Sequence, residues 1–140
     1  MTFSKKAILL SGILLCCFAQ LGAQVRQTRE EYISRYMPIA IAHMERYGIP
    51  ASITMAQGIL ESDCGNSLLS MKSNNHFGIK CKRNWTGDKV YHDDDAKGEC
   101  FRSYSSVEES YRDHAEFLDS QPRYDSLFAY PSNDYKSWAR

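Results

Sequence analysis

The sequence predicts a single, mainly helical α+β domain, and three observations lead to this class. Two capping boxes, Thr28-Arg-Glu-Glu31 and Ser106-Val-Glu-Glu109, mark the starts of two helices. Between them, apolar residues at spacings of three and four over 50–61 predict a buried helix. Strand-like segments follow at 76–81, 89–92 and 99–104. Helices around a small antiparallel sheet form one core, which 140 residues are enough to build.

Residues 1–23 have the pattern of a secretory signal peptide. Two lysines precede an apolar run over 7–18, and small residues then offer cleavage after Ala19 or Ala23. The run is too short for a comfortable membrane span. Cys16 raises lipoprotein processing as an alternative, although the residues before it are larger than those expected before a lipid-modified cysteine.

The remaining residues, 24–140, have a composition that argues against nucleic-acid binding. Without Lys5 and Lys6, 15 of the 17 basic residues remain together with all 17 acidic residues, which gives a net charge of −2. Binding to a phosphate backbone needs a clustered basic surface. We expect a monomeric, exported domain in the periplasm, in the cell envelope or outside the cell. We expect no nucleic-acid partner and no stable membrane span after cleavage.

Three cysteines lie in this exported part: Cys64, Cys81 and Cys100. An odd number in an exported chain predicts one disulfide and one free thiol. Cys81 and Cys100 stand beside predicted neighbouring strands, which favours their pairing, although spacing alone leaves the connectivity open. We interpret Cys64 as a small apolar group, because no base that could activate a nucleophile lies near it in the sequence.

The first predicted helix runs from Thr28 to about Tyr47, and Pro38 either kinks it or restarts it. Gly48 ends it. Its predicted apolar face consists of aliphatic and sulfur-containing side chains: Ile33, Met37, Ala40, Ile41 and Met44.

Glu61 stands in the last turn of the apolar helix that Pro50 begins and Gly65 ends. Burial and the negative end of the helix both make a carboxylate there costly to ionise. A carboxyl group that keeps its proton near neutral pH is what general-acid catalysis needs. Glu61 is therefore the first candidate catalytic residue; a solvated surface glutamate is the alternative.

The rest of the chain predicts a hairpin followed by helices. Residues 93–98 form the expected hairpin loop, and a helix from Ser106 to about Leu118 follows. A short aromatic segment lies at 124–130, and Asp134 is placed to cap a final helix.

Two motifs, in compatible order and spacing, closely resemble glycoside hydrolase family 73. The first is the segment 56–65, with Gln57 and Leu-Glu-Ser ending at Ser62, and the second is Asn-His-Phe-Gly-Ile-Lys at 75–80. These enzymes are the bacterial β-N-acetylglucosaminidases of autolysins and of the flagellar rod-cap muramidase. The resemblance runs from about Tyr36 to the last residue.

This resemblance implies a lysozyme-like fold, with a helical lobe and a small β-hairpin lobe flanking a glycan groove. It implies an endo-β-N-acetylglucosaminidase that cleaves peptidoglycan on the GlcNAc side, with Glu61 as general acid and no cofactor. Endo and exo action are both compatible with the sequence. The family pattern continues beyond a Trp-Ala pair such as Trp138-Ala139, so the C-terminal part of the domain looks missing.

The second carboxylate is expected in the hairpin, where Asp93 and Glu99 flank the turn and either can face the groove. We rank Asp93 above Glu99, and Asp94 third. A second carboxylate too far away for direct attack would activate a water molecule and give inversion. The substrate's own N-acetyl group could instead act as the nucleophile. A solvated acidic turn is the alternative for each residue.

The expected sugar-binding residues are Asn75, whose amide suits an N-acetyl group, and the aromatic side chains of Phe77 and Tyr104. For Phe77, a plain core position is the alternative. Trp85 and Tyr91 would extend the sugar platform. We interpret both His76 and His114 as structural.

Other site types fit less well. Asp93-x-Asp95-x-Lys97 is similar to a calcium loop, but Lys97 stands where an oxygen ligand is needed. Zinc spacings are absent from the sequence. A muramidase or lytic transglycosylase on the same fold, and a glycan-binding module without catalysis, remain the alternative functions.

Overall fold

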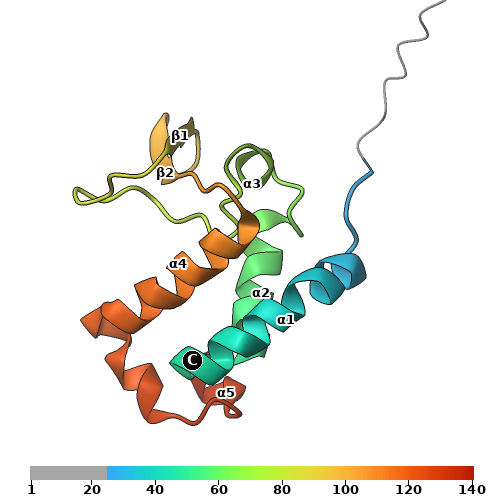
Figure 1. The fold of residues 1–140 in the computed structure, drawn as a ribbon. Helices are drawn as coiled ribbons and strands as arrows, with labels where there is room; N and C mark the ends of the chain where they lie inside the picture. Colours follow the sequence, from blue (N-terminus) through green and yellow to red (C-terminus); the bar gives the residue numbers. More distant parts are fainter. Residues whose placement is uncertain (1–24) are drawn as a thin grey trace, which may run out of the picture.

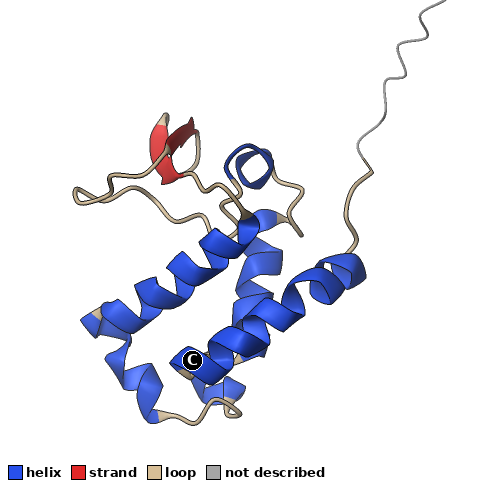
Figure 2. Cartoon of the chain, in the orientation of Figure 1, coloured by secondary structure: helices blue, strands red, loops and turns tan. Residues whose placement is uncertain are grey.

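The computed structural model describes residues 25–140, so the predicted signal peptide lies outside the described residues. Three longer helices, α1 (Arg29–Tyr47), α2 (Ala51–Ser62) and α4 (Val107–Ser120), build the helical lobe. The short helix α3 (Leu68–Ser73) and a hairpin of β1 (Lys89–His92) and β2 (Glu99–Arg102) lie together at one end of these helices (Figure 1). The 3-10 helix η1 (Pro122–Ala129) and α5 (Tyr135–Trp138) lie at the opposite end. Helices predominate and the sheet is a single small hairpin (Figure 2). The predicted mainly helical α+β class is confirmed.

Helix α1 begins and ends as predicted. The Thr28 hydroxyl accepts from the Glu31 N–H at 3.2 Å, and the Glu31 carboxylate accepts from the Thr28 N–H at 2.8 Å. Gly48 ends the helix with a φ of 77°. Pro38 lies inside the helix without ending it. Its side chain is exposed, so water can satisfy the carbonyl that loses its partner. None of the described helices is long and apolar enough to cross a membrane.

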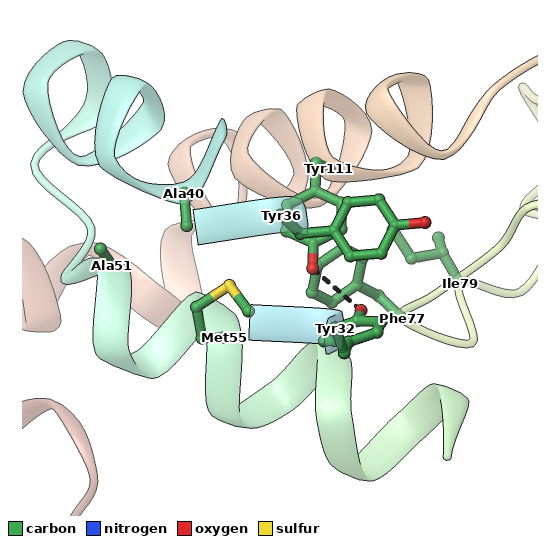
Figure 3. Packing of buried hydrophobic residues seen from close by; sticks show 8 residues of the cluster. All are labelled: Tyr32, Tyr36, Ala40, Ala51, Met55, Phe77, Ile79 and Tyr111. Atoms are coloured by element: carbon green, nitrogen blue, oxygen red, sulfur yellow. Dashed lines mark hydrogen bonds between the residues drawn. The ribbon is translucent and has the colours of Figure 1, made fainter. Parts of the chain in front are cut away.

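The larger hydrophobic core, between α1, α2 and α4, contains several aromatic side chains (Figure 3). Tyr32 and Tyr36 of α1 are buried, whereas the predicted apolar position Ile41 is 40% exposed. The Tyr111 hydroxyl of α4 donates to the Tyr32 hydroxyl at 2.9 Å. The other residues predicted for the apolar face of α1 do lie in this core or pack against it: Ile33, Met37, Ala40 and Met44. Only Ile41 is corrected, and the two buried tyrosines are added to the face. Tyrosine can be buried here because its hydroxyl finds a partner across the core.

Gly58 allows α2 to approach these tyrosines. A Cβ at this position would lie 2.6 Å from the Tyr32 hydroxyl oxygen and 3.0 Å from that of Tyr111. A second apolar cluster closes the other end of the helical lobe, where Trp138 of α5 packs with Ile49 and Leu118.

The second predicted capping box forms in a shifted version. The Ser106 hydroxyl accepts from the Glu109 N–H at 3.3 Å, as predicted. The Glu109 carboxylate, however, accepts from the N–H of Ser105, one residue earlier than expected. Asp134 caps α5 by accepting from the Ser137 N–H.

The hairpin strands pair in antiparallel register, with Lys89 opposite Arg102 and His92 opposite Glu99. The predicted strand over 76–81 is wrong, because this segment makes only one bridge, between Lys80 and Phe101. Gly78, with a φ of 58°, turns the chain there.

A disulfide joins Cys81 to Cys100, with 5.4 Å between the Cα atoms. It ties the segment after Lys80 to β2, where the Cys81 N–H also donates to the Cys100 carbonyl at 2.8 Å. Cys64 is a free, half-buried thiol at the end of α2.

Candidate active site

A groove of about 470 Å³ runs between the helical lobe and the segment that follows Phe77. Helix α2 contributes Gln57 and Glu61, one turn apart. The other lining residues come from the 77–82 segment, α4 and η1: Phe77, Gly78, Ile79, Lys80, Cys81, Lys82, His114, Phe117, Leu118 and Tyr124. The walls are mostly apolar or aromatic, with a few polar groups, which is typical of a ligand-binding groove.

Glu61 lies in the last turn of α2, where its side chain faces Gly78. A Cβ on Gly78 would lie 3.7 Å from Glu61 Oε2, and glycine therefore leaves open space beside the carboxylate. Glu61 is exposed, so the expected burial of this carboxyl group is corrected.

Asn75 holds the turn of the second motif. Its Nδ2 donates to the carbonyls of Ile79 at 3.0 Å and Arg102 at 2.9 Å, and its Oδ1 accepts from the Ile79 N–H at 3.1 Å. The side chain is 1% exposed and is not among the groove residues. These bonds use both ends of the amide, which corrects the expectation that Asn75 binds a sugar N-acetyl group.

Phe77 both lines the groove and packs in the core. Its ring stacks on His114 with 3.9 Å between the centroids, and it meets Tyr111 edge-on at 4.8 Å. The groove and core interpretations of this residue therefore describe two faces of the same ring.

His114 links this ring to helix α2. Its Nε2 lies 2.9 Å from Gln57 Oε1, while its Nδ1 is buried without a partner among the described residues. Burial, with a smaller contribution from the nearby His43, lowers the pKa of His114 to about 3, so the imidazole is neutral at pH 7. Gln57 was missed as a site residue, although its spacing of four from Glu61 places both on one helix face.

His76 is structural. It is buried, and its Nδ1 lies 2.9 Å from the hydroxyl of Tyr32. Burial lowers the pKa of His76 to about 4. The neutral ring accepts the hydrogen that Tyr32 donates, which extends the buried chain from Tyr111.

The hairpin carboxylates gather around one lysine. The Lys80 ammonium lies 2.9 Å from Glu99, 3.0 Å from Asp95 and 3.4 Å from Asp94. The hydrogen bond from Lys80 lowers the pKa of Glu99, and a bond from the Ala96 N–H adds to this effect. Lys80 itself lines the groove, so it connects the acidic turn to the groove edge.

The oxygens of Asp94, Asp95 and Glu99 lie within 4.8 Å of one another, but the Lys80 ammonium supplies the positive charge there. Asp93 shapes the turn, since its Oδ1 accepts from the Gly98 N–H at 2.7 Å. Neither Asp93 nor Glu99 is among the groove residues.

Tyr104 lies outside the groove, in a polar network behind the hairpin. Its hydroxyl donates to Asp113, which also pairs with Arg102 at 2.8 Å. Burial raises the pKa of Tyr104, and the hydrogen bond to Asp113 raises it further. The Arg102 guanidinium stacks over Trp85 at 4.5 Å, and Tyr91 points to solvent with 68% of its surface exposed. None of Tyr104, Trp85 and Tyr91 lines this groove, and their role in a sugar platform stays a prediction.

Comparisons with known proteins agree with this geometry. Residues 37–140 match the family Glucosaminidase, described as mannosyl-glycoprotein endo-beta-N-acetylglucosaminidase. The chain is 33% identical over 117 residues to the peptidoglycan hydrolase FlgJ of Vibrio cholerae, with 76% of this chain and 35% of that protein aligned. It is 46% identical over 82 residues to the exo-glucosaminidase LytG of Bacillus subtilis, covering 53% of this chain and 28% of that protein. The solved glycoside hydrolase domain of Salmonella typhimurium FlgJ matches with a TM-score of 0.63 and 28% identity, over 74% of this chain and 68% of that one.

The mainly helical lobe, the small hairpin and the groove with Glu61 define a glycoside hydrolase domain of the lysozyme-like fold. Within this class, the chain belongs to the glucosaminidase family, glycoside hydrolase family 73, as its two motifs indicate. It spans about a third of the length of the curated relatives it matches.

Proposed function

We propose that this chain is an exported peptidoglycan hydrolase that cleaves the β-1,4 bond on the GlcNAc side of the glycan strand. The observation that carries the proposal is Glu61 at the groove, at the end of an otherwise apolar helix and opposite Gly78. The peptidoglycan hydrolase and glucosaminidase names of its relatives support the substrate. The leader pattern over residues 1–23 supports export to the periplasm, the cell envelope or the outside of the cell.

In this mechanism, Glu61 gives its proton to the glycosidic oxygen as the bond to the GlcNAc anomeric carbon breaks. The resulting oxocarbenium-like state needs a negative charge, an attacking water or the carbonyl oxygen of the substrate's own N-acetyl group. Aromatic groove residues such as Phe117 and Tyr124 offer faces for sugar rings.

For the second carboxylate we now favour Glu99 over Asp93. Glu99 is half-buried, and its pKa is lowered by Lys80, which lines the groove. Glu99 does not itself line the groove, but its ion pair with Lys80 links it to the groove edge, where an ionised carboxylate can orient water or balance positive charge. Asp93 is exposed and, among the described residues, forms no ion pair with Lys80; its Oδ1 accepts from the Gly98 N–H in the turn.

The test is digestion of purified peptidoglycan with the wild-type chain and with Glu61→Gln, followed by mass spectrometry of the soluble products. Reducing GlcNAc ends that are lost in the variant support the proposal. Reducing or anhydro-MurNAc ends instead identify a muramidase or a lytic transglycosylase. Binding of both forms to sacculi, without any product from a folded wild-type chain, identifies a glycan-binding module.

A further inference from the structure

Of the two polar atoms of the Gln57 side-chain amide, only the oxygen has a hydrogen-bond partner among the described residues. Its Oε1 is held by His114 at 2.9 Å. Its Nε2 has no hydrogen-bond partner among residues 25–140, and it is not one of the buried unsatisfied atoms. Gln57 lines the groove one helical turn before Glu61, so we infer that this NH₂ group is available to a ligand in the groove.

The chemistry of His114 decides which end of the amide faces the groove. If the ring carries its hydrogen on Nε2, that N–H donates to Gln57 Oε1, and the buried Nδ1 is only an unpaired acceptor. In the opposite arrangement, the amide donates to Nε2 and a buried Nδ1–H has no acceptor. Orphaned buried donors are rarer than under-satisfied acceptors. The first arrangement is therefore favoured, and Gln57 presents two N–H donors to the groove.

Phe77 keeps the imidazole in place. The two rings stack at 3.9 Å with an angle of 15° between their planes, and His114 is buried. A ring held on its face cannot turn without losing this packing. Phe77 therefore positions His114, and His114 positions the amide of Gln57.

We propose that Gln57 is a substrate-binding residue whose side-chain N–H donates to the N-acetyl carbonyl oxygen of the sugar held next to Glu61. A fixed pair of donors selects an acceptor, and an amide carbonyl oxygen is a stronger acceptor than the hydroxyl and ether oxygens of the sugar. The apolar groove residues, such as Ile79 and Leu118, suit the methyl group of the same substituent. The inference rests on the proposed function and makes His114 a positioning residue.

The first experiment compares the kinetics of wild type, Gln57→Leu and Gln57→Met on soluble peptidoglycan strands. Loss of one substrate hydrogen bond is expected to lower kcat/KM about tenfold in both variants. Thermal unfolding checks that each variant is folded, and the methionine variant is used if the leucine variant is not. Values within twofold of wild type, while Glu61→Gln is inactive, would overturn the inference and leave the proposed function intact. A wild-type chain that releases no reducing GlcNAc ends would instead overturn the proposed function.

A competition assay tests the chemical assignment. N-acetylated and de-N-acetylated glycan fragments are compared as inhibitors of the digestion of labelled strands. Wild type is expected to prefer the acetylated competitor about tenfold, and Gln57→Leu to lose this preference. A variant that discriminates as well as wild type would contradict the N-acetyl assignment, as would a wild type without any preference.

Two variants of His114 test whether this residue positions the amide of Gln57. His114→Gln can keep a donor for Gln57 Oε1, whereas His114→Phe removes it. We expect His114→Phe to lower kcat/KM as much as Gln57→Leu does. The double variant His114→Phe with Gln57→Leu should have a kcat/KM no lower than that of either single variant. His114→Gln should have a higher kcat/KM than His114→Phe. Additive losses in the folded double variant would show that His114 does not act through Gln57.

Discussion

Phe77 and His114 stack face to face, with 3.9 Å between their centroids, and so join the second sequence motif to helix α4 beneath the groove. Phe77 comes from the turn that Asn75 holds, and His114 reaches Gln57 on the helix of Glu61. Through its contacts with Phe77 and Gln57, His114 of α4 therefore joins the second motif to helix α2. Because aromatic packing of this kind is sensitive to shape, stability and activity should change together when it is disturbed.

Replacement of Phe77 by alanine should lower the free energy of unfolding by about 3 kcal/mol, because a buried ring is lost and a cavity remains. Urea unfolding at pH 7.5 measures the change. Tyr91→Ala is the matched control, since Tyr91 is 68% exposed, and it should stay within about 0.5 kcal/mol of wild type. Equal losses in the two variants would contradict the core role of Phe77.

Gly78→Ala should lower activity more than its effect on stability explains. Gly78 has a φ of 58°, and a new Cβ would stand 3.7 Å from Glu61 Oε2. The backbone strain alone costs about 1 kcal/mol. Gly98→Ala is the matched control, because Gly98 has a φ of 68° and open space around its Cβ position.

Both glycine variants should therefore lose similar stability, measured by urea unfolding. Only Gly78→Ala should lower kcat, since its methyl group would occupy space beside Glu61, the proposed proton donor. Equal kcat values for the two variants would show that the space next to Glu61 is not needed.

Stability should fall on acidification below about pH 6.5, because two buried histidines must stay neutral. Burial lowers the pKa of His76 to about 4 and that of His114 to about 3. The unfolded chain takes up these protons near pH 6.5, before the native state does, so stability is complete above this pH and declines as the pH falls towards 4.

For His76 alone, the loss by pH 4 is about 3 kcal/mol from the shift in pKa. Urea unfolding at pH 7.5, 5.5 and 4.5 measures the slope. His76→Asn should flatten it while lowering stability at pH 7.5, where the bond from Tyr32 is weakened. An unchanged slope in this variant would assign the pH dependence to other groups.

Removing the disulfide should destabilise the fold. Cys81 and Cys100 are 19 positions apart, and a loop of this length gives about 3 kcal/mol in the chain-entropy account. Cys81→Ser with Cys100→Ser should show this loss in urea unfolding. Cys64→Ser is the control for loss of a thiol outside the bridge. Because Cys64 is only half-buried, this variant should lower the free energy of unfolding by less than about 1 kcal/mol. A double variant as stable as wild type would contradict a stabilising role for the bridge.

The helices and their caps could be predicted from the sequence because these signals are local. Thr28 bonds to a group three residues away, and Gly48 ends α1 through its own backbone conformation. The position of Glu61 in the last turn of an apolar helix was predicted in the same way, and this residue lines the groove, while its role as the general acid stays a prediction. The second motif was recognised, but the pattern over 76–81 was interpreted as a strand, because the turn depends on bonds from Asn75.

The sequence by itself determined the class of domain, most helix boundaries and the place of Glu61 in the last turn of α2, since each depends on residues close together in the chain. Tertiary structure decided which polar groups remain free to bind a ligand. Asn75 and Tyr104 have suitable chemistry, but distant partners occupy their polar atoms. Gln57 has one free end because His114, 57 positions later, occupies the other. Each polar side chain has a limited number of donors and acceptors, and which of them are already occupied depends on packing between segments that the local sequence does not encode.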